Sequence, residues 1–169
     1  MEFPQVERAD ADALTHFLTA HEWPFHVKPK LGPDDVRDRL EKGAFNDAFW
    51  IVDTGAKVGI VRLMDLDDGT PLFDLRIANA ARGRGVGYAA VRWLTEHVFT
   101  NYATNRVEGT TRQDNHAMRR VFAKAGYVKE AHYRDAWPAH DGPHDSVGYA
   151  ILRRDWQTGT TTTVNWADE

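Results

Sequence analysis

The sequence predicts a single α/β domain built around one β-sheet, and three observations point to it. The chain has 169 residues, 42% of them hydrophobic, which is enough to enclose one hydrophobic core. Apolar residues recur at helical spacing in some segments and alternate with period two in others. A glycine-rich turn at residues 82–87 joins an alternating strand to an apolar helical segment.

Two helices are expected near the N-terminus. Apolar residues lie at helical spacing across residues 11–20, and Pro33 suits the first position of a second helix. The segment between them, residues 22–30, contains two prolines and several large side chains. Because proline prevents regular helix, we expect an ordered loop there.

Three strands should follow as a meander. Residues 49–53 and 57–64 flank the hairpin signal Thr54-Gly55-Ala56, and a polar loop leads to a third strand at 72–77. Side chains alternate between the two faces of a strand. The third strand therefore places Phe73, Leu75 and Ile77 on one face and Leu72, Asp74 and Arg76 on the other.

The C-terminal half alternates helix and strand. After the glycine-rich turn we expect a helix at 88–99, a strand at 106–111, a helix at 115–125 ended by Gly126, and strands at 127–133 and 146–152. The domain then spans residues 1–156. Residues 157–169, with four consecutive threonines, form a tail that is either loose or an added strand.

The composition argues against several classes of function. The 21 basic and 25 acidic residues give a net charge of −4, which disfavours holding nucleic acid by bulk electrostatics. The chain has no cysteine, which excludes disulfides, thiolate metal sites and a cysteine nucleophile. No apolar stretch approaches the roughly 18 residues of a membrane helix, and residues 1–10 are charged. We expect a soluble cytoplasmic protein without nucleic-acid or membrane partners.

The turn Arg82-Gly-Arg-Gly-Val-Gly87 carries most of the functional signal. Three alternating glycines remove Cβ atoms where a helix begins, so successive N–H groups can converge on an anion at the positive end of the helix dipole. The glycines could also serve only a tight turn. Gly85 to Ala90 fits a dinucleotide-binding pattern as well, but only 79 residues follow Ala90, too few for the further βα units of such a fold.

This turn and two later motifs resemble the GNAT superfamily of acetyl-CoA-dependent N-acetyltransferases. Residues 82–87 are similar to its pyrophosphate loop, and residues 111–115 with 122–127 are similar to its second cofactor motif. The second half, including 129–133, is similar to the ribosomal-protein N-terminal acetyltransferase branch. The resemblance spans nearly the whole chain. It implies an α/β (α+β) fold with a short strand before the first helix and a mixed, mainly antiparallel central sheet of about 6–7 strands flanked by about 4 helices.

The resemblance also implies acetyl-CoA as cosubstrate and a set of cofactor-binding residues. In the superfamily, the asparagine matched by Asn115 hydrogen-bonds the pantetheine arm, although Asn115 also suits a helix N-cap. Lys124 would lie near the nucleotide or be solvated. The cofactor-binding residues implied are Ile77, Ala78, Arg82, Gly83, Arg84, Gly85, Val86, Gly87, Tyr88, Asn115, Phe122 and Lys124.

The reaction would be a direct attack by an amine on the thioester in a ternary complex. Near pH 7, deprotonating a lysine-like amine of pKa about 10.4 costs roughly 4 to 5 kcal/mol, whereas an α-amino group near 7.8 costs only about 1. Three residues are candidates for the proton acceptor. Asp74 points into the site or pairs with an arginine, His132 replaces a glutamate of the ribosomal branch or is a half-exposed strand residue, and Glu108 lies beside the cofactor helix.

Two departures from the family concern the general acid. Phe122 stands where many members place a tyrosine, and Met118 stands where the ribosomal branch has a serine. Tyr133 or Tyr149 could protonate the leaving thiolate, or the thiolate could leave without a donor.

Two aromatic, histidine-bearing segments are expected to recognise the acceptor. Trp23, Phe25, His26 and Trp137 would wall a pocket for an apolar or flat amine, and Asp74 with Asp135 would attract its ammonium. The alternative is that Trp23 and Phe25 pin the early helices to the core. No metal is expected, because the histidines and aspartates at 140–145 match no recognised ligand spacing.

These observations predict an N-acetyltransferase that acts on a primary amine of a protein N-terminus or a small molecule. The alternative is a non-catalytic CoA-binding sensor or interaction module that kept the cofactor turn. The sequence does not decide between a monomer and a homodimer.

Overall fold

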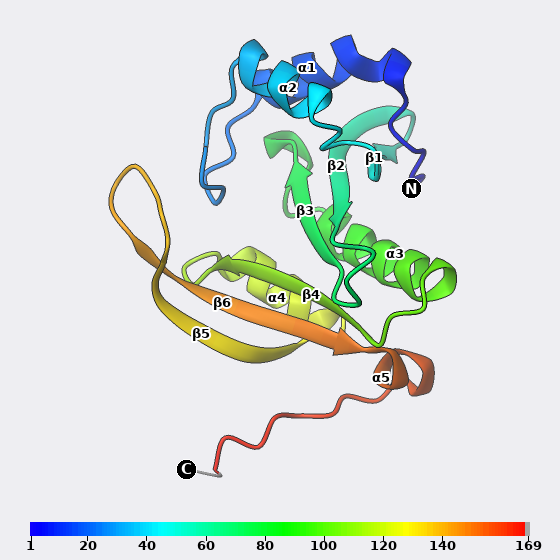
Figure 1. The fold of residues 1–169 in the computed structure, drawn as a ribbon, viewed down its shortest axis with the longest axis vertical. Helices are drawn as coiled ribbons and strands as arrows, with labels where there is room; N and C mark the ends of the chain where they lie inside the picture. Colours follow the sequence, from blue (N-terminus) through cyan, green and yellow to red (C-terminus); the bar gives the residue numbers. More distant parts are fainter. Residues whose placement is uncertain (168–169) are drawn as a thin grey trace. The chain divides into compact units, whose positions relative to one another are not determined.

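The computed structural model describes residues 1–167 and divides into two compact units, each with its own sheet (Figure 1). Unit 1 comprises residues 1–64 and 74–86, and unit 2 comprises residues 65–73 and those from 87 onward. The strands form two three-stranded sheets, which replace the one continuous sheet that the sequence predicted. The mixed α+β class is confirmed. Each helix within the described residues is too short or too polar to cross a lipid bilayer.

Unit 1 packs two helices against the sheet β1-β2-β3. Its elements are η1 (Arg8–Asp10), α1 (Ala11–Ala20), α2 (Pro33–Glu41), β1 (Ala48–Asp53), β2 (Ala56–Met64), β3 (Leu72–Ile77, which enters the unit at Asp74) and η2 (Asn79–Ala81). Leu14 and Leu18 of α1 and Val36 of α2 are almost wholly buried. Their core also contains Phe17, Trp23, Leu31, Phe45, Ala48, Trp50, Ile60 and Ala78.

The N-terminal segment forms the short strand that the family resemblance implied. Glu2 pairs with Val52 and Gln5 pairs with Phe49 in antiparallel bridges, which add residues 2–5 to the edge of β1. At the other end of β1 the expected hairpin is present. Thr54 and Gly55 both have positive φ, at 49° and 82°, the geometry that matches a two-residue turn to the twist of its strands.

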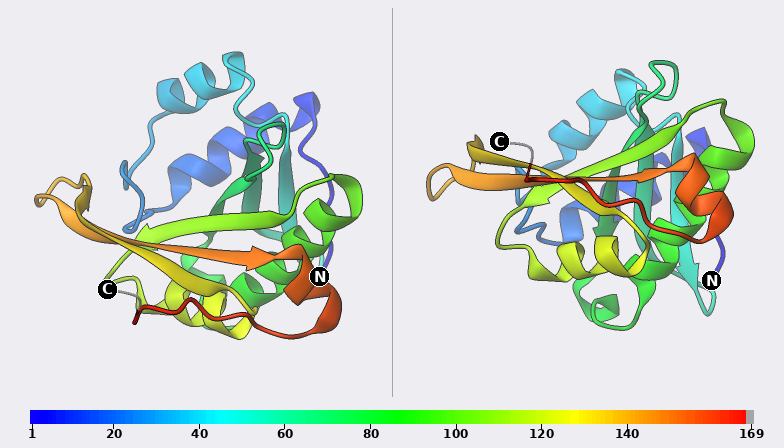
Figure 2. Two further views of the ribbon diagram at one scale, coloured as in Figure 1. Left: turned by 60° about the horizontal axis from the view of Figure 1, so that its bottom comes forward. Right: turned by 90° about the horizontal axis from the view of Figure 1, so that it is seen from below.

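Unit 2 is built on the antiparallel sheet β4-β6-β5. Its elements are α3 (Val86–Asn101, whose first residue belongs to unit 1), β4 (Arg106–Arg112), α4 (His116–Lys124), β5 (Val128–Trp137), β6 (His144–Leu152) and α5 (Arg153–Thr158). The β5–β6 hairpin continues beyond the end of β4, as Figure 2 shows, and it closes at the pair Trp137 and His144.

Helix α4 packs on this sheet through one aromatic residue. The ring of Phe122 stacks on Tyr149 of β6, with centroids 4.7 Å apart and planes 9° from parallel. Gly109 of β4 leaves room for that ring, because a Cβ there would lie 2.5 Å from the Phe122 Cζ. A glycine in this strand is therefore a packing requirement.

Three expectations for the C-terminal part are wrong. β5 runs on to Trp137 rather than ending at residue 133, because its pairing with β6 resumes after an irregular stretch. The proposed domain boundary at 156/157 falls inside α5, a helix that the sequence did not predict. The threonines at 160–163 form no strand. Thr162 instead donates from its N–H and Oγ1 to the Asp155 carboxylate, 2.8 Å in each case.

Candidate functional site

The glycine-rich turn has an open backbone directly before α3. Gly83 and Gly85 have φ of +74° and +84°, a region that other residues enter only with strain. A Cβ built at either glycine would meet no atom within 4 Å. The first N–H groups of α3 follow immediately, and helix-initial N–H groups have no partner within the helix. The turn can therefore admit an anion such as a diphosphate close to the main chain.

The two arginines of this turn have different environments. Arg82 donates from Nε to the carbonyl of Ile77 at 3.0 Å and from Nη2 to the carbonyl of Glu22 at 3.1 Å. It therefore braces the turn against the protein's own backbone. Arg84 is 60% exposed, with Nη2 3.6 Å from the Asp53 carboxylate, so its guanidinium can turn toward a ligand.

Asn115 is the N-cap of α4. Its Oδ1 accepts from the N–H of Met118 at 3.2 Å, and its Nδ2 donates to Thr111 Oγ1 at 3.0 Å. The capping role that the sequence suggested is confirmed. A contact with the pantetheine arm stays a prediction.

The remaining predicted cofactor residues fall into buried and accessible groups. Phe122 is 1% exposed, and the stacked ring is part of the core of unit 2. Lys124 is exposed, and its Nζ lies 4.4 Å from the centroid of the Tyr88 ring. A hydrogen bond from Arg92 lowers the pKa of Tyr88. Ala78 and Val86 are buried, whereas Ile77 and Gly87 are half-buried.

Asp74 joins the predicted substrate loop to β3. Its Oδ1 lies 2.9 Å from His26 Nε2, and its Oδ2 accepts from Arg76 Nη2 at 3.2 Å. Burial by itself would raise the pKa of Asp74, but the His26 hydrogen bond and the charges of Arg76 and Arg62 hold it well below its usual range. The predicted arginine pair is present. A carboxylate held ionised this firmly is a poor proton acceptor.

Trp23 lies in the core rather than on an exposed wall. It is 1% exposed, its Nε1 donates to the Leu18 carbonyl at 3.0 Å, and the Arg76 guanidinium lies 5.4 Å from its ring centroid. The alternative role of pinning the early helices is therefore the one observed. Phe25, on the same loop, is half-buried. Trp137 is also half-buried, at the end of β5 in unit 2.

A second His–Asp pair lies on the β5–β6 hairpin. His132 Nε2 is 2.6 Å from Asp145 Oδ2, and Asp145 Oδ1 accepts from the N–H of Asp135 at 3.0 Å. The His132 bond, followed by that N–H, lowers the pKa of Asp145. Glu108 of β4 forms an ion pair with Arg106 Nε at 2.8 Å. Because β6 lies between β4 and β5, Glu108 and His132 do not meet.

The sequence analysis did not single out the arginines around Asp74. Arg62 of β2 and Arg39 of α2 both act electrostatically on Arg76, together with Asp74. One signal could have found them. Arg62 lies two residues after the buried Ile60, and Arg76 two residues before the buried Ala78, so both guanidiniums fall in the core-facing phase of their strands.

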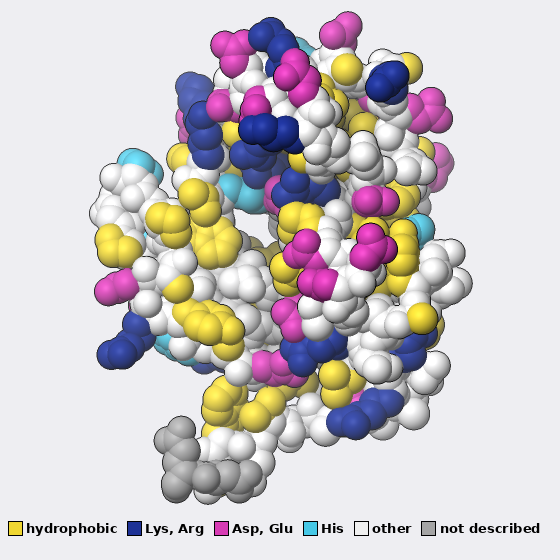
Figure 3. Space-filling model, in the orientation of Figure 1, with side chains coloured by type: hydrophobic (Ala, Val, Ile, Leu, Met, Phe, Trp, Pro, Cys, Tyr) yellow, Lys and Arg dark blue, Asp and Glu magenta, His cyan; other side chains and the backbone are white. Residues whose placement is uncertain are grey.

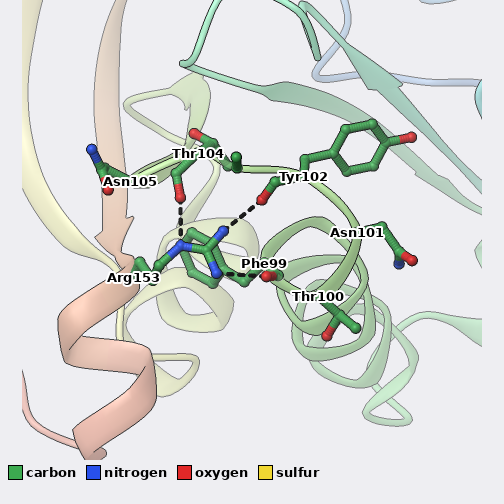
Figure 4. Close-up of a pocket in the computed structure, with 8 residues that line it drawn as sticks. Phe99, Thr100, Asn101, Tyr102, Thr104, Asn105 and Arg153 are labelled. Carbon is green, nitrogen blue, oxygen red and sulfur yellow. Dashed lines mark hydrogen bonds between the residues drawn. The ribbon is translucent and has the colours of Figure 1, made fainter.

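A recess of about 470 Å³ in unit 2 lies away from these residues. It is lined by residues 99–105 and Arg153, at the C-terminal end of α3 (Figure 4). The Arg153 guanidinium donates to the carbonyls of Phe99, Tyr102 and Thr104, each at 2.6 Å. These bonds satisfy carbonyls that a helix end leaves free. The recess is therefore explained by helix capping.

Comparison with known proteins identifies the family. The family described as "Acetyltransferase (GNAT) domain" matches residues 1–128, which is more than half of the chain. The proposed ribosomal N-acetyltransferase YdaF of Bacillus subtilis (strain 168) is 30% identical over 167 residues, covering 90% of this chain and 91% of YdaF.

Solved structures share the fold. A spermidine N-acetyltransferase from Vibrio cholerae in complex with CoA and spermine matches with a TM-score of 0.77 and 17% identity, covering 92% of this chain and 97% of that chain. Mycobacterium smegmatis RimJ in complex with CoA-disulfide matches with a TM-score of 0.77 and 20% identity, covering 90% and 82%. None of these matches supports a non-catalytic module. The chain is an acetyl-CoA-dependent N-acetyltransferase and belongs to the GNAT acetyltransferase family.

Proposed function

We propose that this chain transfers the acetyl group directly to a primary amine while the turn at 82–87 holds the diphosphate of acetyl-CoA. The observation that carries the proposal is the open main chain at Gly83 and Gly85 directly before the first turn of α3. Arg84 can add a guanidinium, and Arg82 keeps the turn in place. Tyr88, Lys124 and Asn115 are the accessible or half-buried side chains that we expect to contact the rest of the cofactor.

In the proposed reaction the neutral amine attacks the thioester carbonyl. A C–N bond forms, the C–S bond breaks, CoA leaves as a thiolate, and the amine proton passes to a base. Backbone donors would steady the developing oxyanion, and proximity would supply much of the acceleration. The buried ring of Phe122 carries no hydroxyl, so we propose that the thiolate leaves without a dedicated acid.

We propose His132 as the proton acceptor. When neutral, His132 donates from Nε2 to Asp145, which leaves Nδ1 as an acceptor, and histidine has an intrinsic pKa near 6.5. The ion pair with Arg106 makes Glu108 a weaker candidate. Asp74 is better suited to orienting His26 than to accepting a proton itself.

The experiment is a rate assay of CoA release with acetyl-CoA and a panel of amines. The panel should begin with a ribosomal-protein N-terminal peptide and with spermidine, the acceptors named for YdaF and for the Vibrio cholerae enzyme. His132→Gln should lower kcat about 100-fold and flatten the acidic limb of the pH–rate profile. His16→Gln, on α1, is the control and should change neither. Release of CoA with no amine at all would refute the proposed function.

We also propose a cytoplasmic location and leave the assembly as a prediction. The absence of cysteine from the chain is compatible with a reducing compartment. Sedimentation of the purified protein with and without CoA distinguishes a monomer from the homodimer left open by the sequence.

A further inference from the structure

The surroundings of Asp74 contain more positive than negative charge. Arg76 shares the face of β3 with Asp74, and its side chain is 7% exposed. Arg62 on β2 and Arg39 on α2 act on Arg76 through space, so burial and these two charges lower the pKa of Arg76 against the opposing charge of Asp74. Three guanidiniums therefore surround one carboxylate in unit 1.

The carboxylates of α2 do not balance this excess. Asp34, Asp35 and Asp38 form ion pairs with Arg37, Lys28 and Lys42 respectively. Basic side chains are prominent on the face of unit 1 in Figure 3. The region beneath the loop at residues 22–30 is thus electropositive.

Three nitrogen atoms of this cluster have no hydrogen-bond partner among residues 1–167. They are Arg76 Nη1, Arg62 Nε and His26 Nδ1, and all three are buried. Unsatisfied buried donors are costly, so each needs a physical explanation. The two guanidinium groups can only donate, whereas Nδ1 of a neutral His26 whose Nε2 donates to Asp74 can only accept.

A ligand that satisfies this set must offer both acceptor oxygens and an N–H donor. A carboxylate supplies the oxygens, and guanidinium groups bind carboxylates through paired, charge-assisted hydrogen bonds. An amine supplies the N–H for His26 Nδ1. A polyamine supplies only positive charge, which the three arginines would repel.

Building on the proposed function, we propose that the acceptor amine of this enzyme carries a carboxylate, which Arg76 and Arg62 recognise. Because the three atoms are enclosed in the ligand-free protein, the acceptor can reach them only if the loop at residues 22–30 shifts. Val27, next to His26, is 57% exposed, so the loop can move without extracting that side chain from the core.

The test uses the full-length protein and acceptors matched in everything but the carboxylate. Rates of CoA release are measured for L-phenylalanine, L-phenylalaninamide and 2-phenylethylamine, for the corresponding lysine series ending in cadaverine, and for spermidine. A peptide pair, Ser-Glu-Ala and Ser-Gln-Ala, tests whether the carboxylate comes from a free amino acid or from an acidic side chain near a peptide N-terminus. We expect kcat/KM to be at least about tenfold higher for the acid member of one series, mainly through a lower KM.

Two variants assign that preference to the arginines. Arg76→Met and Arg62→Gln should each reduce the ratio of acid to uncharged acceptor to within about threefold, whereas Arg37→Gln, an exposed position on α2, should leave it unchanged. The ratio is the readout because partial unfolding lowers both rates equally. Arg62 is only half-buried, so its variant remains informative if Arg76→Met does not fold.

Several outcomes would overturn the inference. They are equal rates for acid and amide, a preference for spermidine or cadaverine, and an acid preference that survives both arginine variants. If no amine is acetylated, the proposed function fails instead. Calorimetric titration of the same pairs into the CoA-bound protein then decides this inference, with tighter binding of the acid required.

Discussion

His26 Nε2 lies 2.9 Å from Asp74 Oδ1, so a single hydrogen bond ties the loop at residues 22–30 to β3 across 48 positions of sequence. The bond joins a residue expected to touch substrate with one expected to do chemistry. It also leaves the imidazole with one free nitrogen, which suits His26 to contact an acceptor amine.

Replacing Asp74 by asparagine should make stability less dependent on acid. The folded-state pKa of Asp74 lies below its unfolded value of 3.8, so its stabilisation is complete well above pH 3.8 and is lost as pH falls toward the folded value. At pH 7 we expect a loss of about 3 to 5 kcal/mol in the free energy of unfolding, because Arg76 and His26 lose a buried partner. Urea titrations at several pH values from 7 to 3 measure the difference from wild type.

That difference should shrink below about pH 4. Asp38→Asn, in a solvent-exposed pair with Lys42, is the control and should differ from wild type by less than about 1 kcal/mol. A difference for Asp74→Asn that stayed constant down to pH 3 would contradict the ionised state of its carboxylate.

The glycine turn allows a matched test of cofactor binding. Gly83→Ala and Gly85→Ala should each cost about 1 kcal/mol of stability because both positions have positive φ, and each should weaken CoA binding about tenfold by displacing the N–H groups. Gly55→Ala has the same backbone cost in the β1–β2 hairpin, with the same open space around its Cβ. Calorimetric titration with CoA should find normal affinity for Gly55→Ala. Weakened binding in all three variants would point to general destabilisation.

Asn115 can be divided into its two hydrogen-bonding functions. Asn115→Ala should lose about 1 kcal/mol of stability, because the N–H of Met118 loses its acceptor. Asn115→Asp keeps an acceptor oxygen for that N–H but removes the Nδ2 donor. If the amide also serves the pantetheine arm, KM for acetyl-CoA rises in both variants. An unchanged KM in both would leave Asn115 with capping alone.

Arg153 should matter far more to stability than its neighbour. Arg153→Ala removes three charge-assisted bonds to carbonyls at the end of α3, and we expect a loss of about 2 to 4 kcal/mol in urea unfolding. Arg154, whose side chain is 70% exposed, is the control, and its alanine variant should change stability by less than about 0.5 kcal/mol. Similar losses for the two variants would refute the capping role.

Local patterns in the sequence were sufficient for most elements of the fold. The positive φ values of the Thr54-Gly55 hairpin, the start of α2 at Pro33 and the N-cap at Asn115 all follow from residue types that favour one backbone geometry. Helix α5 was missed because its six residues are too few for a period to appear. Its end at Gly159, with φ of +67°, was the one local signal available.

The sequence by itself determined the family, the alternation of helix and strand, and a phosphate-suited turn before α3, since these depend on neighbouring residues. Only the tertiary structure decided that His26 meets Asp74, that Asp135 supports the His132–Asp145 pair, and that Arg62 and Arg76 are buried together. Side chains from distant segments come together through strand pairing and core packing. The protonation and charge of a site depend on burial and on partners that no local pattern specifies.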